Sequence, residues 1–212
     1  MEDAGARLDV NRADEAELRG LLVALHVDAG LADRIAQAIA DWRDLDDLHR
    51  PRGAERDWYE RAGRPVLPRN GPVESVAELR HVKDVSEPIY RQVAPYLSVD
   101  GTGRVNLTAA PRPVLLALPG IGEEVAGLIE RYRTEPRLLP PLTQLEPELS
   151  PWAWTRLAAN LPQLLSRTTT ETREVRIRSV GRVPGSPVRV FADALVVRSA
   201  GAAHLVRQTV TP

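Results

Sequence analysis

The sequence predicts an α+β protein in which a large helical part is followed by a small antiparallel sheet. Between residues 11 and 166, apolar residues recur at helical spacing between turn-forming segments. From about residue 170 the pattern becomes an alternation of valine or other apolar residues with arginine, which is typical of half-buried strands. Three strands alone are marginal, so we expect a helix or another chain to cover one face of the sheet.

The helical part divides into short helices with hydrogen-bonding signals at their first turns. Asp14 and Glu17, three residues apart, predict a capping box just before an apolar-spaced run. Ser75 and Glu78 predict a second capping box. The expected helices cover residues 11–25, 30–42, 75–82, 86–97 and 150–165, together with a helix pair over 105–133.

Three antiparallel strands are expected after the helices, over residues 172–180, 187–199 and 203–210. The turn-forming stretches GRVPGS (181–186) and AGAA (200–203) separate them. Because side chains alternate between the two faces of a strand, the arginines should line one outer face.

The net charge of −1 gives the chain no general attraction to nucleic acid or to an anionic membrane. Acids outnumber arginines in residues 1–60 and the reverse holds in residues 167–212, which suggests two regions with different roles. The sequence has no cysteine, which excludes disulfides and thiolate metal sites. It also has no run of about 18 apolar residues, and its first ten residues are unlike a signal peptide.

Three segments share a helix–turn–helix plan, and the third contains the stretch LPGIG at residues 118–122. A glycine turn of this kind frees backbone N–H groups that bind phosphate in helix-hairpin-helix modules. Here Glu123 and Glu124 follow the turn, satisfy the helix N-terminus and repel phosphate. We interpret the hairpins as packing units. A helix-hairpin-helix DNA-binding protein of the competence type is the alternative.

An acidic loop is the segment best suited to bind a metal ion. Its carboxylates begin at a helix C-terminus, where the helix dipole disfavours negative charge without a cation. Carboxylates at alternate positions in a glycine-containing loop suit Ca²⁺, although the spacing is not that of an EF-hand. The alternative is a solvated loop paired with nearby arginines. The acids are Asp41, Asp44, Asp46, Asp47, Glu55 and Asp57, and the arginines are Arg43, Arg50, Arg52 and Arg56.

The sequence has no recognised catalytic motif. The four histidines, at positions 26, 49, 81 and 204, are scattered and not at ligand spacing. A glycine-rich phosphate loop, a zinc signature and a nucleophile elbow are all absent from the sequence. We therefore expect no enzymatic activity, with a metal-dependent hydrolase that uses the acidic loop as a third hypothesis.

Four stretches, taken in order, resemble the type II secretion minor pseudopilin of the K class. They are DVNRADEAELRGLL, IADWRDLDDL with RGAERDWYE, PRNGPVESVAELRHVKDVSEPIYRQVAPYLSV and GRVNLTAAPRPVLLALPGI, across residues 9–121. The run from Asp41 through Glu55 to Asn70 and Gly71 is a specific part of the resemblance, whereas LPGIG is shared with many DNA-binding hairpins.

The resemblance implies a large all-α domain inserted in a small pilin-type antiparallel sheet. Residues 1–10 would then end the first pilin strand, and residues 167–212 would form the C-terminal β region of the pilin fold. Residues 11–166 would form the inserted domain, with an acidic metal-binding loop at about 41–57. The resemblance also implies calcium in this loop. Its expected ligands are Asp44, Asp46 and Glu55, with Asp41 and Asp47 as further candidates.

The resemblance further implies a place at the tip of the periplasmic pseudopilus, together with minor pseudopilins of the I and J classes. The family's apolar N-terminal helix and prepilin cleavage site are not in this sequence. We therefore interpret the chain as the soluble periplasmic part of a protein that this helix anchors in the inner membrane of a diderm bacterium. We expect it to initiate or cap the pseudopilus for protein secretion, without binding nucleic acid.

Overall fold

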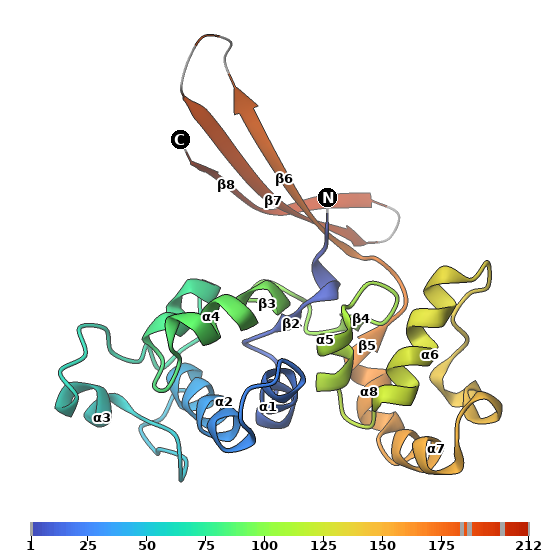
Figure 1. The fold of residues 1–212 in the computed structure, drawn as a ribbon. Coiled ribbons are helices and arrows are strands. Elements are labelled where there is room, and N and C mark those ends of the chain that lie inside the picture. Colours follow the sequence, from blue (N-terminus) through green and yellow to red (C-terminus); the bar gives the residue numbers. More distant parts are fainter. Residues whose placement is uncertain (1, 183–184, 186–187, 200–201, 212) are drawn as a thin grey trace.

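The computed structural model describes residues 2–182, 185, 188–199 and 202–211. A body made mostly of short helices, residues 4–169 and called here the helical body, carries a long twisted sheet that stands away from it (Figure 1). Every helix in the described part of the chain is too short or too polar to cross a membrane. The helices are α1 (Glu15–Ala24), α2 (Ala29–Arg43), α3 (Arg56–Arg61), α4 (Glu87–Val93), α5 (Arg112–Ala117), α6 (Glu123–Thr134), α7 (Pro151–Ala158) and α8 (Leu161–Arg167).

The main sheet is antiparallel and contains strands from both ends of the chain. Its order is β1-β6-β7-β8, with β1 at Glu2–Asp3, β6 at Glu174–Arg182, β7 at Arg189–Ser199 and β8 at Ala202–Thr211. The helical body therefore lies between the first strand and the remaining strands. The predicted α+β class is confirmed, whereas the helix-hairpin-helix character of the repeats stays a prediction. Parts of the two expected turns, at 183–184, 186–187 and 200–201, lie outside the described residues.

Two pairs of two-residue parallel strands close the helical body near the main sheet. In the first pair β2 (Leu8–Asp9) lies beside β3 (Leu97–Ser98), and in the second β4 (Val105–Asn106) lies beside β5 (Thr168–Thr169). Each pair joins segments that are distant in sequence. The chain thus leaves and re-enters the main sheet through the same part of the body.

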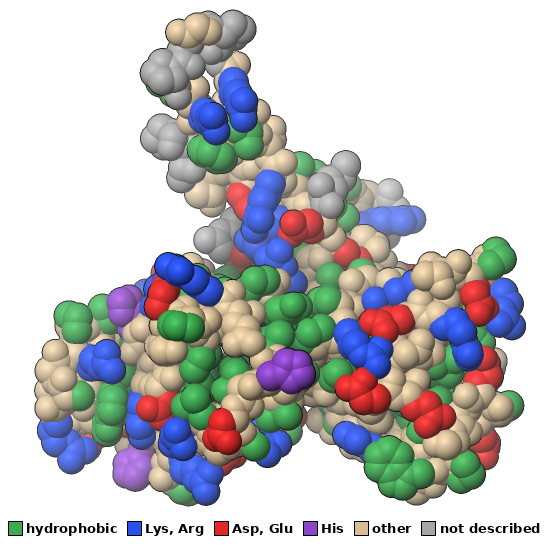
Figure 2. Space-filling model, viewed as in Figure 1, with side chains coloured by type: hydrophobic (Ala, Val, Ile, Leu, Met, Phe, Trp, Pro, Cys, Tyr) green, Lys and Arg blue, Asp and Glu red, His purple; other side chains and the backbone are tan. Residues whose placement is uncertain are grey.

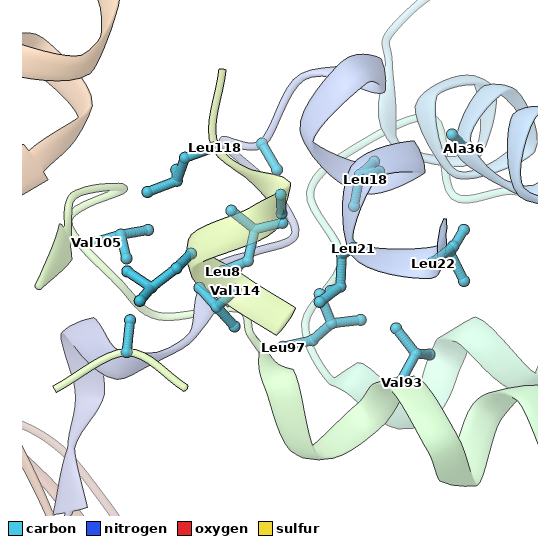
Figure 3. Close-up of a cluster of buried hydrophobic side chains, with 14 of the residues drawn as sticks. Leu8, Leu18, Leu21, Leu22, Ala36, Val93, Leu97, Val105, Val114 and Leu118 are labelled. Atoms are coloured by element: carbon cyan, nitrogen blue, oxygen red, sulfur yellow. The ribbon is translucent and has the colours of Figure 1, made fainter. Parts of the chain in front are cut away.

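Helix α1 lies at the centre of the core and packs against both α2 and α5. Its Leu18, Leu21 and Leu22 are buried, and Figure 3 shows them between side chains that come from the neighbouring helices and short strands. The surrounding buried side chains include Leu8, Ala36, Val93, Leu97, Val105, Val114 and Leu118. Burying a leucine or valine contributes about 1.5–3 kcal/mol, so this cluster supplies much of the stability of the body.

Local hydrogen bonds fix the helix starts that the sequence predicts. Asp14 and Glu17 form a capping box at α1, and Ser75 and Glu78 form one at the helix predicted over residues 75–82. Glu17 is 1% exposed and also accepts two hydrogen bonds from the Arg167 guanidinium, at 3.2 and 2.6 Å. The ion pair links α1 to the C-terminal end of α8.

Three expected helices differ from the structure. The helix expected at 86–97 ends at Val93 and is followed by a 3₁₀ turn over Ala94–Tyr96. Residues 76–81 form a 3₁₀ helix rather than an α-helix, and the backbone is extended on both sides of it, at Ser75 and Val82. The expected helix at 150–165 is two helices, α7 and α8. Pro162 lies at the start of α8, where its missing N–H and its ring prevent one continuous helix.

Candidate metal centre

The acidic loop joins the last turn of α2 to the first turn of α3. Asp41 lies in α2 and points into the protein, Asp44 is the residue that ends α2, and Glu55 is the residue that begins α3. Asp41 is fully buried and Glu55 is 1% exposed, whereas the side chain of Asp44 is 25% exposed. The two helix ends thus bring together carboxylates that are up to 14 residues apart in sequence.

These three carboxylates form one cluster. One oxygen from each of Asp41, Asp44 and Glu55 lies within 4.8 Å of the other two. Calcium–oxygen bonds of 2.3–2.6 Å place ligand oxygens on opposite sides of an ion about 5 Å apart. The spacing of the cluster is therefore compatible with three oxygens around one Ca²⁺.

Two further expected ligands, Asp46 and Asp47, lie in the loop outside this three-carboxylate cluster. An Asp46 oxygen accepts a hydrogen bond from the backbone N–H of Leu48 at 2.8 Å, and both Asp46 and Asp47 are exposed. Asp47 accepts from the Asn70 side chain at 2.9 Å. The other end of that amide, Asn70 Oδ1, is buried and receives no hydrogen bond. Asn70 therefore offers a further oxygen beside the loop.

Arg50 is the positive charge closest to the cluster. Its Nη1 donates to Asp41 Oδ1 at 2.6 Å and to Asp44 Oδ2 at 2.7 Å, and its Nε donates to Glu15. The other three arginines of the loop region lie elsewhere. Arg43 donates to backbone oxygens of residues 10 and 13, Arg52 pairs with Asp33, and Arg56 pairs with Glu60.

Glu55 differs from the other two carboxylates because nothing donates to it. Both of its oxygens are buried without a hydrogen bond, and so is Asp44 Oδ1. Burial, followed by the negative charges of Asp41, Asp44, Asp47 and Asp46, raises the pKa of Glu55 to about 7. Buried oxygens without donors are costly, and a bound cation would remove that cost. The residues present therefore fit a divalent cation with oxygen ligands.

Two further residues, Gly53 and Lys83, hold the loop in place. Gly53 lies against Asp41, so that a β-carbon at this position would fall 1.9 Å from Asp41 Oδ2. Lys83 donates from Nζ to the Gly53 carbonyl at 2.9 Å, and its own N–H donates to the Tyr59 hydroxyl at 2.9 Å. Lys83 is the one lysine of the sequence, which is the only feature that could have drawn attention to it.

The LPGIG hairpin, by contrast, is filled by the protein's own side chains. Glu124 accepts hydrogen bonds from the N–H and hydroxyl of Ser150, at 2.6 and 2.7 Å, and thereby connects α6 to the start of α7. Gly120 has φ of +80°, and a β-carbon there would lie 2.8 Å from Asn160 Cβ. Glu123 pairs with Arg112 at 2.5 Å. In a DNA-binding hairpin this turn would contact a phosphate. Here it packs against α7 and the start of α8, and Glu123 and Glu124 follow it.

Comparison with known proteins finds relatives for part of the chain. Residues 3–101 match the family model of the type II secretion system protein K. The chain is 36% identical over 87 residues to a putative type II secretion system protein K from Escherichia coli K12, which is 41% of this chain and 27% of that protein. It is 33% identical over 105 residues to the protein K of Pectobacterium carotovorum, which is 47% of this chain and 32% of that protein. The matched parts therefore span about a third or less of these relatives.

The fold has a solved counterpart that covers the whole chain. It is a chain of the GspK–GspI–GspJ complex from the type 2 secretion system of enterotoxigenic Escherichia coli. The TM-score is 0.79 at 18% sequence identity, and the match covers all of this chain and 78% of that one. The two chains share the fold despite their low identity.

A sheet interrupted by a helical body after its first strand, together with these matches, defines the protein as a minor pseudopilin of type II secretion. Residues 3–101 match the type II secretion system protein K family, and the curated relatives and the solved structure support the same family. This is a family of structural pseudopilins and not a known class of enzyme.

Proposed function

We propose that this chain works in the periplasm as a non-enzymatic subunit of the pseudopilus tip, where it assembles with minor pseudopilins of the I and J classes. The observation that carries this proposal is the match of the entire chain to a chain from the GspK–GspI–GspJ complex. In this role the subunit initiates or caps the pseudopilus for protein secretion. No catalytic step is required of its residues.

The main sheet offers a surface suited to such assembly. By register, Ile177 of β6, Ala194 of β7 and Val210 of β8 belong to one face, together with their apolar neighbours at alternate positions. Val190, Leu205 and Val210 on this face are 40%, 58% and 55% exposed. Exposed apolar surface of this kind marks a binding site for another protein element. An apolar helix of a pilin-type subunit fits this face, because the described residues on it carry few charged groups.

The test is reconstitution with the periplasmic parts of the cognate I- and J-class pseudopilins, measured by size-exclusion chromatography with light scattering. We expect a ternary complex that contains one copy of this chain and one copy of each partner. Leu205→Asp should weaken it, because the charge would be buried on the apolar face. Thr209→Asp is the matched control, since Thr209 lies on the opposite face of the same strand. Three separate peaks at micromolar concentrations would contradict the proposed assembly, and equal effects of both variants would contradict the choice of face.

We also propose that the acidic loop binds Ca²⁺ through Asp41, Asp44 and Glu55. The support is the group of buried carboxylate oxygens that lack donors in a cluster of suitable spacing. Asn70 Oδ1, Asp46 and Asp47 offer further oxygens in the loop region, and the family resemblance favours the two aspartates. A bound Ca²⁺ supplies positive charge between α2 and α3 and thereby stabilises the loop. It serves structure and not catalysis.

Calcium titration followed by calorimetry tests this second proposal directly. We expect one saturable site in the chelator-treated protein, and a melting temperature that falls with chelator and returns with added Ca²⁺. Asp44→Asn should weaken binding, whereas Asp57→Asn should not, because Asp57 is exposed and pairs with Arg61. If the chelator leaves the melting temperature of the parent protein unchanged, the protein's own contacts hold the loop without a metal ion.

A further inference from the structure

Arg50 is held beside the acidic cluster from several directions. Its Nη1 donates to Asp41 Oδ1 at 2.6 Å and to Asp44 Oδ2 at 2.7 Å, and its Nε donates to Glu15, the first residue of α1. Its backbone N–H also donates to the two Asp41 oxygens, at 3.2 and 3.3 Å. These contacts tie the guanidinium to the start of α1 and to the end of α2. The side chain is therefore fixed at one side of the cluster.

The contacts of Arg50 divide the carboxylate oxygens into two groups. Asp41 Oδ1 and Asp44 Oδ2 accept from the guanidinium. Asp44 Oδ1 and both oxygens of Glu55 are buried and receive no hydrogen bond, and Asp41 Oδ2 lies against Gly53. Each aspartate thus keeps one oxygen on Arg50 and has its other oxygen for a different partner. The guanidinium and a cation need not compete for the same atoms.

The charges of the cluster and of Arg50 match a divalent cation. Three ionised carboxylates and one guanidinium carry a net charge of −2, and a guanidinium stays charged at every pH that the protein survives. Glu15 is 44% exposed, so solvent screens its charge. Lys83 donates to backbone carbonyls and not to the carboxylates. Without Arg50 the same cluster would have three negative charges, which favour a trivalent ion more strongly.

Charged groups further away have less influence on this balance. On the face of the helical body that Figure 2 shows, basic and acidic side chains are mixed and do not form separate fields of one sign. Salt also screens exposed charges beyond about 10 Å. Asp46 and Asp47 add negative charge to the loop, but both are exposed and lie outside the three-carboxylate cluster. The groups in direct contact with the cluster therefore dominate its charge.

We propose that Arg50 is a fixed counter-charge of the calcium site, which orients Asp41 and Asp44 and makes the site prefer a divalent to a trivalent cation. This inference rests on the calcium binding proposed above, and it assigns a role to a residue outside the ligand set. The orienting contacts help any cation equally. The positive charge discriminates, because it repels a trivalent ion more than a divalent one. Specificity then comes from a repulsive element as well as from the ligands.

The alternative is an arginine that occupies the place of the ion and swings away when the ion binds. The observed contacts favour the fixed arrangement, because Arg50 leaves Asp44 Oδ1 and both oxygens of Glu55 without a donor while Glu15 holds it from another side. The two arrangements differ in their effect on selectivity. Displacing an arginine costs the same free energy whichever ion replaces it, so its removal would strengthen the binding of all cations equally.

Competition between Tb³⁺ and Ca²⁺ tests the proposal. The two ions have similar radii and both prefer oxygen ligands. Tb³⁺ luminescence is excited through Trp42, which follows Asp41 in the chain, and the 212-residue protein loaded with Tb³⁺ is titrated with Ca²⁺. Because the protein stays loaded, the result does not depend on the stability of metal-free variants. Arg50→Gln should raise the preference for Tb³⁺ over Ca²⁺ by about tenfold, since the lost charge repels three unit charges more than two.

Two variants separate the charge of Arg50 from its contacts and its location. Arg50→Lys keeps the charge but loses the planar set of donors, so both ions should bind more weakly by a similar factor while the preference stays within about twofold of the parent. Arg52→Gln is the matched control for lost charge. Arg52 belongs to the same loop, pairs with Asp33 at 2.8 Å and is 55% exposed, so its removal should leave the preference unchanged.

Several results would overturn the proposal. An unchanged preference in Arg50→Gln with tighter binding of both ions would make Arg50 a displaced competitor. An unchanged preference with weaker binding of both ions would reduce it to a support of the loop. Equal shifts in Arg50→Gln and Arg52→Gln would assign the effect to general surface charge. A parent protein that binds neither ion would refute the calcium site and this inference together, whereas the first three results would leave the calcium site intact.

Discussion

Replacing Glu55 with glutamine is expected to stabilise the metal-free protein at pH 8 and to leave its stability nearly unchanged at pH 5. The reason is the negative charge that the Glu55 carboxylate carries at pH 8 and not at pH 5. Above its pKa, Glu55 places a buried negative charge beside Asp41 and Asp44 without a donor of its own. Glutamine has nearly the same shape and no charge, and its NH₂ group can donate to the neighbouring carboxylates.

The magnitude follows from the pKa of Glu55, which rises from 4.5 to about 7 on folding. Between these two values the folded protein binds more protons than the unfolded chain, so its stability falls as the pH rises. The loss begins near pH 4.5 and is complete just above pH 7. At about 1.4 kcal/mol per pH unit, it amounts to about 3 kcal/mol. For a protein of this size that corresponds to about 6–12 °C in melting temperature.

Thermal denaturation in chelator at pH 5 and pH 8 measures the effect. The parent protein should lose stability between the two values, and Glu55→Gln should lose much less. Glu60→Gln is the matched control, because Glu60 belongs to the adjacent helix α3 and is 54% exposed. With Ca²⁺ at about 1,000 times the dissociation constant at pH 8 the order should reverse, since the ion binds the ionised carboxylate and stabilises the parent by about 4.1 kcal/mol.

The reasoning is refuted if the difference in melting temperature between Glu55→Gln and the parent is the same at pH 5 and pH 8 in chelator. Such a result would show that the Glu55 carboxylate is not destabilised by its surroundings. If calcium stabilised Glu55→Gln as much as the parent, the ion would bind without this side chain.

Three other predictions concern the supports of the site and of the body. Gly53→Ala should weaken calcium binding by about tenfold to a hundredfold in a titration, because the methyl carbon would displace the Asp41 carboxylate. Gly71→Ala should bind as the parent does, because a β-carbon there meets only ordinary van der Waals contacts with Arg69. Arg167→Ala should lower the free energy of unfolding in urea by about 3 kcal/mol, because it leaves the buried carboxylate of Glu17 unpaired. Gly120→Ala should lower the free energy of unfolding by about 1–3 kcal/mol in the same assay, because Gly120 has a positive φ and is closely packed. Binding of short duplex DNA to the parent protein at micromolar concentration, with steep salt dependence, would contradict this packing role.

Features that depend on near neighbours in the sequence were predictable. The capping boxes at Asp14 and Ser75 are confirmed because they need only a fixed spacing of three residues and a backbone that turns into a helix. The three C-terminal strands of the main sheet are confirmed because alternation of side chains directly reflects the two faces of a sheet. The break between α7 and α8 was missed, although Pro162 is visible in the sequence, because apolar spacing continues across it.

Long-range arrangements could not be derived from such patterns. The pairing of β1 with β6 joins residues 2–3 to residues 175–176, and no periodicity in the two-residue strand signals it. Only the family resemblance led to the expectation of an inserted helical domain. The ligand set of the acidic loop could not be derived from the sequence pattern either. Its carboxylates are obvious in the sequence, but the choice of Asp41, Asp44 and Glu55 depends on how Arg50, Gly53 and Lys83 shape the chain.

The composition of the acidic loop explains why it needs ionic contacts. In residues 44–55, which are all described, Leu45 and Leu48 are 83% and 79% exposed, and Ala54 is the one buried apolar side chain. A loop of this length without regular structure cannot be held by apolar burial when its leucines face solvent. Arg50 and Lys83 supply part of the missing stabilisation, yet both oxygens of Glu55 stay without a donor. A cation at this point would therefore stabilise the part of the helical body where the apolar core contributes least.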